Sequence, residues 1–224
     1  MKKNFLISTG GSGGHVLPAT ILYDHLSDQA NVTLSTDKRG LKYLNTTFYK
    51  FKIIDTPKLN NIFFLPFNLI KIIFLTIKSF CFLKKEKIEK IFSTGGYMSL
   101  PIILAAKMQN LNIYLLEPNQ VLGRSNKYFL NVCKKIFCYT NQIKNYPDDY
   151  KSKMIIINPL VKESIYNLKT QKKIKDKFTL LIVGGSQGAS IFDYKLKDMI
   201  NNVSKEKPIK IIHQTNEKNI LSLR

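Results

Sequence analysis

The chain has 224 residues, of which 44% are hydrophobic, and its formal net charge is +20. This composition excludes a wholly disordered chain and permits a substantial buried core. The charge indicates an anionic partner, either nucleic acid, anionic lipid or a phosphorylated substrate, although the lysine-rich composition of an AT-rich genome is an equally good explanation.

The amino terminus and the cysteines both indicate a cytoplasmic protein. The first apolar run is too short for a signal peptide, and no small-residue cleavage site follows it. The three cysteines, Cys81, Cys133 and Cys138, are odd in number and lack zinc-like spacing. Plain thiols in a reducing compartment are the simplest interpretation.

Short apolar runs alternate with helical patterns over residues 1–158. This alternation predicts an α/β fold with a parallel sheet that is covered on both faces. We expect strands at 4–8, 31–35, 49–54, 90–93, 112–116 and 154–157, and helices at 16–26, 66–85, 101–108 and 125–132.

The first expected strand leads into the turn Thr9-Gly10-Gly11-Ser12-Gly13-Gly14-His15 at the start of a helix. Glycines allow close approach of the backbone to a ligand and a helix amino end attracts anions, so the turn suits a diphosphate. Its spacing matches neither a dinucleotide-binding turn nor a P-loop. A tight turn without a ligand is the alternative. His15 could serve as a general base or pair with a phosphate, although a lone histidine is more often structural.

The stretch 62–83 is apolar enough to suggest a transmembrane helix, but a proline and two lysines interrupt it. Lys71, Lys78 and Lys85 recur every seven residues and therefore fall near one line on a helix. This cationic stripe beside an apolar face that includes Phe74 predicts a helix lying in a membrane interface. The alternative is a buried crossover helix whose lysines are solvated.

Polar turns follow two later strands. One contains Gly95-Gly96-Tyr97, and the other contains Glu117 and Asn119, with Asn126 shortly after it. Ligands of open α/β sheets bind at the carboxyl ends of the strands, so these polar residues are expected to converge with His15 on one cleft, or else to cap helices.

A polar, lysine-rich stretch at 159–178 is interpreted as a linker to a second α/β unit. The pattern restarts with a strand at 179–183, the glycine turn 184–188, a helix at 190–200 and a strand at 209–213. The second glycine turn suggests a ligand held between two units. Because two strands and one helix cannot cover both faces of a parallel sheet, residues 179–224 are expected to form the beginning of an incomplete second domain.

Six motifs along the chain resemble, in order, those of the MurG family of bacterial glycosyltransferases. They are GGSGGHVLPA at 10–19, GGYMSLP at 95–101, EPN at 117–119 with SNK at 125–127, NP at 158–159, GGSQGA at 184–189 and HQT at 213–215. Two departures stand out. Leu160, Val161 and Lys162 replace a small residue followed by arginine, and the family's uridine-binding and sugar-binding segments would lie after residue 224.

The resemblance implies a GT-B fold, with a Rossmann-like amino domain for a lipid acceptor and a second Rossmann-like domain for a nucleotide sugar. The implied reaction is inverting transfer from UDP-N-acetylglucosamine to lipid I, the undecaprenyl-diphosphate-linked N-acetylmuramyl-pentapeptide, which forms lipid II for peptidoglycan. It implies an anionic membrane surface as a partner, on the cytoplasmic face of the inner membrane, and no metal or other cofactor. No nucleic acid is expected, since the chain lacks a recognisable RNA-binding or helix-turn-helix motif.

Because the second domain is expected to be cut short, the alternatives to an active transferase are a non-catalytic lipid-diphosphate-binding remnant or half of a split enzyme.

The resemblance also implies roles for individual residues. The implied roles are catalysis for His15 and Glu117, donor or diphosphate binding for Ser12, Gly13, Gly14, Asn119 and Ser186, acceptor contact for Tyr97 and Asn126, and membrane contact for Lys71, Phe74, Lys78 and Lys85.

Overall fold

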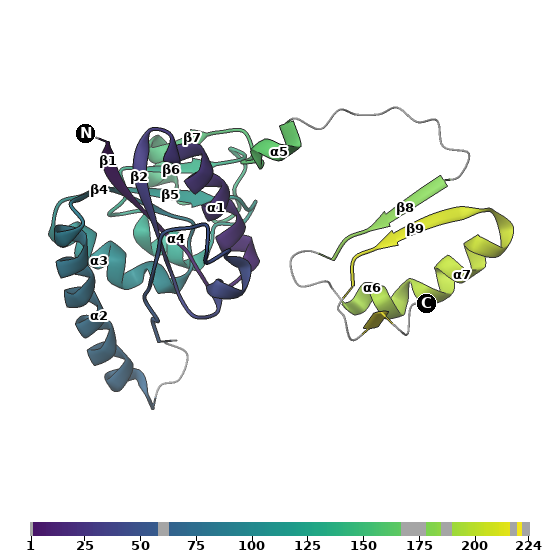
Figure 1. Ribbon diagram of the computed structural model, residues 1–224, viewed down its shortest axis with the longest axis horizontal. Helices are drawn as coiled ribbons and strands as arrows, with labels where there is room; N and C mark the ends of the chain where they lie inside the picture. The colour runs from purple at the N-terminus through teal and green to yellow at the C-terminus, as the bar shows by residue number, and fades with distance from the viewer. Residues whose placement is uncertain (1, 58–62, 167–177, 185–189, 216–218, 221–224) are drawn as a thin grey trace. The chain divides into compact units, whose positions relative to one another are not determined.

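The computed structural model describes residues 2–57, 63–166, 178–184, 190–215 and 219–220 (Figure 1). It contains two compact units, Met1–Tyr166 and Asn167–Arg224. The elements of the first unit are β1 (Lys3–Ser8), α1 (Gly13–Ser27), β2 (Ala30–Thr36), η1 (Gly40–Tyr43), β3 (Phe51–Ile53), α2 (Leu65–Lys85), β4 (Ile88–Ser93), η2 (Tyr97–Ser99), α3 (Leu100–Met108), β5 (Asn112–Glu117), α4 (Arg124–Phe129), β6 (Lys135–Cys138), η3 (Asp148–Lys153), β7 (Met154–Ile156) and α5 (Glu163–Tyr166).

The first unit is built on a seven-stranded sheet in which every pair of neighbours is parallel. The strand order is β3-β2-β1-β4-β5-β6-β7. The direction in which successive strands are added reverses between β1 and β4. The chain leaves β1 toward β2 on one side and leaves β4 toward β5 on the other side. Such a switch point is where open α/β sheets bind ligands. The α/β, Rossmann-like fold predicted from the sequence is confirmed.

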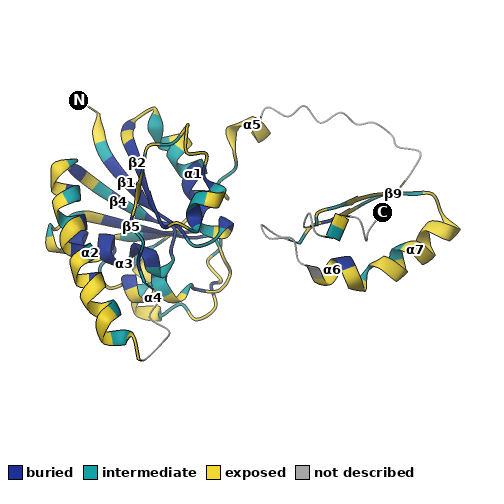
Figure 2. Ribbon diagram, turned by 60° about the horizontal axis from the view of Figure 1, so that its bottom comes forward, coloured by how far each residue is buried: buried dark blue, intermediate teal, exposed yellow. Residues whose placement is uncertain are grey.

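Alternation along β1 shows why both faces of this sheet are covered. Phe5 and Ile7 are buried in one apolar cluster together with Val16 of α1. Leu6 points to the other face, where it is buried in a second cluster with Leu83 of α2. Successive side chains of a strand point to opposite faces, so an unbroken apolar strand requires a layer on each side. Buried residues accordingly line the sheet and the helix faces turned toward it (Figure 2).

The sequence missed β6 because it follows α4 so closely. The helical pattern predicted at 125–132 ends at Phe129, where the amides of Val132 and Cys133 both turn back to the Phe129 carbonyl. The next residues pair with β5, beginning with the Lys134 amide, which donates to Ile113 O at 2.8 Å. A four-residue strand carries too little periodicity to be separated from a preceding helix without knowledge of this pairing.

The second unit is smaller. Its strands β8 (Phe178–Ile182) and β9 (Ile209–His213) pair in parallel, and between them lie α6 (Ser190–Lys195) and α7 (Lys197–Glu206). The single helix predicted at 190–200 is therefore two, joined at Leu196, and the second extends further than expected. The division between the units falls after residue 166, within the range 159–178 that the sequence predicts as a linker.

Candidate functional site

The turn between β1 and α1 leaves two amides available to a ligand. In the part of the chain that the structure describes, the amides of Gly13 and Gly14 have no hydrogen-bond acceptor. The Gly11 amide, by contrast, donates to Asp37 Oδ1 at 2.8 Å. Ser12 is the N-cap of α1, but its side chain makes no capping bond. The start of this 15-residue helix thus has two amides without an acceptor and an uncommitted hydroxyl, with Gly14 exposed and Gly13 buried, and unpaired amides at a helix start favour an anion.

His15 lies directly after these amides, and the turn after β4 sets its orientation. Its Nδ1 lies 2.7 Å from the carbonyl oxygen of Thr94. A carbonyl only accepts hydrogen bonds, so Nδ1 carries the proton and, in the neutral ring, Nε2 is an acceptor. The side chain is half-buried. This is the arrangement that a general base requires.

Gly95 lies in the turn after β4 and is close to residues that follow β1 and β5. Its φ is +93°, and a Cβ placed on it would lie 3.3 Å from His15 Cε1 and 3.5 Å from Asn126 Nδ2. Glycine is therefore needed both for its backbone angle and for the space between these side chains. His15 and Asn126, far apart in the sequence, therefore both lie next to this glycine.

Glu117, at the end of β5, is buried and forms hydrogen bonds through both of its carboxylate oxygens. The side chain is 2% exposed. Its Oε1 accepts from the backbone and side-chain nitrogens of Asn119, at 3.2 and 2.9 Å, and its Oε2 accepts from the Gly123 amide at 2.8 Å and from Asn126 Nδ2 at 2.9 Å. Because both oxygens are occupied inside the protein, the geometry favours a role in positioning Asn119 and Asn126 over the catalytic role expected from the sequence.

Asn126 completes this side of the site. Its Nδ2 also donates to the Leu116 carbonyl at 3.2 Å, which leaves its Oδ1 as the acceptor. That oxygen is buried and has no partner within the described ranges. A buried amide oxygen without a donor costs stability.

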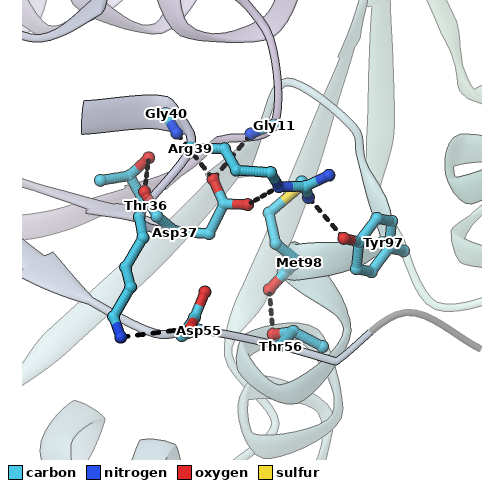
Figure 3. Close-up of polar contacts among 10 residues, drawn as sticks. Gly11, Thr36, Asp37, Arg39, Gly40, Asp55, Thr56, Tyr97 and Met98 are labelled. Atoms are coloured by element: carbon cyan, nitrogen blue, oxygen red, sulfur yellow. Dashed lines mark hydrogen bonds and ion pairs between the residues drawn. The ribbon is translucent and has the colours of Figure 1, made fainter. Parts of the chain in front are cut away.

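A group that the sequence analysis missed contacts the glycine turn at Gly11 (Figure 3). Asp37 follows β2 directly and is 1% exposed. Its Oδ1 accepts from the Gly11 and Gly40 amides at 2.8 and 2.9 Å, and its Oδ2 accepts from Arg39 Nε at 2.8 Å. Arg39 Nη2 donates in turn to the Tyr97 hydroxyl, and the guanidinium carbon lies 5.2 Å from the centre of the Tyr97 ring. The only local signal was an acidic residue followed by arginine and glycine after a strand.

The environment of Tyr97 keeps its hydroxyl protonated. Partial burial raises the pKa of Tyr97 above its ordinary value, and the positive charge of Arg39 opposes this rise without cancelling it. Tyr97 therefore carries its proton at neutral pH and can donate a hydrogen bond.

Helix α2 carries the membrane-contact residues expected from the sequence. It is the one helix within the described ranges that is long and apolar enough to cross a membrane, yet only 17% of its most apolar 18-residue stretch is buried. A core helix of comparable composition would be mostly buried. Lys71, Lys78 and Lys85 are exposed and make no ion pair with a described carboxylate. The exposed apolar side chains are Phe67, Leu69, Ile70, Ile73, Phe74 and Ile77, whereas Ile72, Thr76, Ser79 and Leu83 form the buried stripe.

In the second unit, Ser186 and most of the glycine turn at 184–188 lie outside the described residues. At the end of β9, His213 Nε2 lies 3.0 Å from Asp193 Oδ1. Asp193 Oδ2 accepts from Thr215 Oγ1 and Asn219 Nδ2, both at 2.7 Å. These two hydrogen bonds, with the nearby His213, lower the pKa of Asp193. No three described side chains of His, Cys, Asp or Glu are grouped so that they could hold a metal ion.

Known proteins are similar to this chain in sequence and in fold. The model of the glycosyltransferase family 28 N-terminal domain matches residues 5–138. The chain is 48% identical, over its whole length and 63% of the relative, to the UDP-N-acetylglucosamine–N-acetylmuramyl-(pentapeptide) pyrophosphoryl-undecaprenol N-acetylglucosamine transferase of Pelagibacter ubique. The protein of that name from Rickettsia felis is 35% identical over 93% of this chain and 59% of its own length. The crystal structure of Acinetobacter baumannii MurG superposes with a TM-score of 0.75 at 24% identity, over 99% of this chain and 63% of that one.

The chain thus spans about three fifths of the length of these relatives. The likeness to the Acinetobacter baumannii structure bears on the fold and supports the Rossmann-like assignment. The family match at residues 5–138 covers more than half of the chain and includes the turns after β1, β4 and β5 that form the site. By this match, the chain belongs to glycosyltransferase family 28.

Proposed function

We propose that this chain is the acceptor-binding part of an enzyme that transfers N-acetylglucosamine from UDP-N-acetylglucosamine to lipid I, forming lipid II for peptidoglycan. The observation that carries the proposal is the meeting of His15 with the open amides of Gly13 and Gly14 at the switch point of the sheet. A base beside an anion site is what a diphosphate-linked acceptor requires. The names of the relatives, at up to 48% identity, supply the substrate class.

In the proposed reaction, the amides of Gly13 and Gly14 and the Ser12 hydroxyl hold the acceptor diphosphate. His15 Nε2 takes the proton of the attacking sugar hydroxyl, whose oxygen forms the new bond to the anomeric carbon of N-acetylglucosamine. The bond from that carbon to UDP breaks, and UDP leaves with the bonding electrons. Attack opposite the leaving group inverts the anomeric configuration. Donor contacts by Asn119 and Ser186 are part of the same proposal.

Glu117 contributes to this reaction indirectly in our proposal. Its carboxylate holds Asn119 and Asn126 on one side of the site, and the Asn126 side chain lies beside Gly95. A carboxylate that accepts four hydrogen bonds orients its donors firmly, because each bond to an ionised acceptor is stronger than a neutral one.

We also propose that α2 rests in the interface of an anionic membrane, on the cytoplasmic face. The helix connects β3 to β4 of one sheet and packs its buried stripe against α3. A helix tied to the sheet in this way cannot cross a bilayer without carrying the sheet with it. Its apolar face and flanking lysines suit a position at the headgroup boundary.

Two assays test the proposed function. In the first, this 224-residue chain replaces its aligned segment in the Pelagibacter ubique relative, and transfer from UDP-N-acetylglucosamine to lipid I is measured. In the second, the chain itself is titrated with farnesyl diphosphate, with farnesyl monophosphate as the control. We expect transfer in the chimera and preferential binding of the diphosphate.

The outcomes separate the alternatives. Binding of the diphosphate without transfer by a folded chimera would favour a non-catalytic lipid-diphosphate-binding protein. The absence of both binding and transfer would contradict the proposed function.

A further inference from the structure

Arg39 links two parts of the site that are separate in the sequence. Its Nε donates to Asp37 Oδ2 and its Nη2 donates to the Tyr97 hydroxyl, 58 residues away. A Cβ placed on Gly11 would lie 3.7 Å from Arg39 Nη2, so the guanidinium runs alongside the glycine turn. The same Asp37 holds the Gly11 amide. Asp37 therefore holds the turn and Arg39, and Arg39 in turn holds the tyrosine (Figure 3).

The direction of the hydrogen bond between Arg39 and Tyr97 determines what the tyrosine can do. A guanidinium only donates, so the Tyr97 oxygen accepts and its own proton is left for another partner. Within the described ranges that proton has no acceptor. The Tyr97 side chain is half-buried, so part of it faces solvent.

The charge of Arg39 is already balanced inside the protein. Asp37 is 1% exposed and lies 2.8 Å from Arg39 Nε, so the pair adds little net charge to the site. Arg39 is held more firmly than a typical surface arginine, since the guanidinium also lies over the ring of Tyr97. Such a residue is better suited to orienting a neighbour than to attracting a distant anion.

We propose that Arg39, held by Asp37, is a positioning residue that fixes the Tyr97 hydroxyl beside the glycine turn as a hydrogen-bond donor to the acceptor diphosphate. This inference rests on the proposed function, since it assumes that the diphosphate binds at Gly13 and Gly14. In this proposal Arg39 affects the affinity for the diphosphate only by orienting Tyr97.

A double-mutant cycle on the 224-residue chain tests this, with farnesyl diphosphate as the probe. Arg39→Gln and Tyr97→Phe are each expected to weaken binding about tenfold, the size of one hydrogen bond to a charged group. The double variant should bind no more weakly than Tyr97→Phe alone. If Arg39→Gln also weakens binding in the Tyr97→Phe background, Arg39 contacts the ligand itself and the proposal is overturned.

Lys38→Gln is the matched control. It removes the same charge one residue away, from a lysine whose side chain is 73% exposed and forms an ion pair with Asp55 at 3.9 Å. It should leave the affinity within about twofold, because exposed ion pairs contribute little. If Arg39→Gln does not fold, Arg39→Lys replaces it, since one ammonium cannot reproduce the two-sided contact of a guanidinium. The cycle with Arg39→Lys is then expected to give the same pattern of affinities as the cycle with Arg39→Gln.

A titration without ligand tests the contact between Arg39 and the Tyr97 hydroxyl separately from the proposed function. 3-Fluorotyrosine at position 97, a stronger acid than tyrosine, is followed by fluorine NMR. The nearby charged groups are Arg39, Asp37 and Asp55. Loss of the Arg39 cation should raise the pKa of residue 97, whereas Lys38→Gln should leave it almost unchanged.

An unchanged pKa in Arg39→Gln would show that the contact is absent in solution and would overturn the proposal. If the unaltered chain fails to bind farnesyl diphosphate, the inferred donation to the diphosphate is overturned, and if the chimera also shows no transfer, the proposed function fails with it. The titration then still decides whether Arg39 holds Tyr97.

Discussion

At the scale of single residues, the orientation of His15 depends on one main-chain carbonyl. Replacing His15 by alanine removes the proposed base and leaves the backbone of the turn unchanged. In the chimera with the Pelagibacter ubique relative, we expect the turnover number to fall by ~10²–10⁴, the usual contribution of general base catalysis. Circular dichroism should show an intact fold, since the side chain is only half-buried.

His25→Ala is the control for this substitution. His25 lies on the same helix, is exposed, and contacts the Val161 carbonyl at 3.3 Å, away from the glycine turn. It should retain normal turnover. Near-normal turnover of His15→Ala would instead remove His15 from the mechanism.

Substitution of Gly14 is expected to affect ligand binding without destabilising the fold. A Cβ at Gly14 would meet only Ser12 Oγ, at an ordinary 3.7 Å, so alanine fits. Alanine is also preferred to glycine in a helix by about 0.5–1 kcal/mol. We therefore expect Gly14→Ala to keep or raise the melting temperature. Its methyl group should nevertheless obstruct the open amides and weaken farnesyl diphosphate binding by about tenfold or more.

Gly11→Ala is the contrasting variant. Gly11 has a φ of +81°, and a Cβ there would lie 2.8 Å from Met98 Cε. This substitution should lower the melting temperature, because the backbone angle and the contact are both unfavourable. Undiminished diphosphate binding by a stable Gly14→Ala chain would contradict the proposed anion site.

At the scale of elements, α2 connects two strands of the sheet and exposes most of its apolar surface. We expect replacement of Lys71, Lys78 and Lys85 by glutamine to weaken sedimentation of the chain with anionic vesicles. Each lysine near an anionic surface contributes about 1 kcal/mol, and salt screens this contribution. The triple variant should therefore also show a weaker dependence on salt.

Two further variants make this test specific. Phe74→Ser removes an apolar side chain that is 61% exposed without changing the charge, so it should weaken binding at every salt concentration. Glutamine at Lys3, Lys134 and Lys144, which are exposed residues outside α2, makes the same change in net charge and should weaken binding less. Equal effects of the two triple variants would mean that the net charge of the chain, rather than α2, governs binding.

At the scale of the whole molecule, the two units differ in how much they bury. The first unit has two apolar clusters that enclose its sheet, whereas Ile182 and Asp193 are the only buried residues among those described in the second. Exchange protection follows the free energy of local opening. Hydrogen exchange should therefore be slow in β1, β4 and β5 and fast in β8 and β9. Equal protection in both sets of strands would contradict this expectation.

The second unit should also be sensitive to acid through Asp193. Hydrogen bonds from Asn219 and Thr215, with the charge of His213, lower its pKa below the ordinary 3.8. A carboxylate with a lowered pKa contributes stability above its unfolded-state pKa, and that contribution is lost as the pH falls through the folded-state value. We therefore expect loss of the β8 and β9 signal below about pH 4.

Asp193→Asn checks this assignment. The variant lacks the titrating group, so it should be less stable than the unaltered chain at neutral pH and should show a flatter dependence on pH below about 4. Carbon-13 NMR of the Asp193 carboxyl gives the pKa directly. A value at or above the ordinary one would refute the role of these hydrogen bonds.

The sequence by itself determined the features that depend on neighbouring residues. The apolar alternation of β1, the glycine turn before α1 and the placement of His15 are local patterns, and each predicted its element and its chemistry. The parallel sheet followed from the repetition of strand and helix. The exposed lysine stripe of α2 followed from its seven-residue spacing.

Only the tertiary structure decided which residues meet. The Asp37–Arg39–Tyr97 group depends on the order of β2, β1 and β4 in the sheet, which places turns far apart in the sequence at one edge. Glu117 is a carboxylate at a strand end by sequence, but its burial and four hydrogen bonds indicate a positioning role. Short-range patterns specify backbone conformation, whereas the partners of a polar side chain depend on long-range packing that no local pattern encodes.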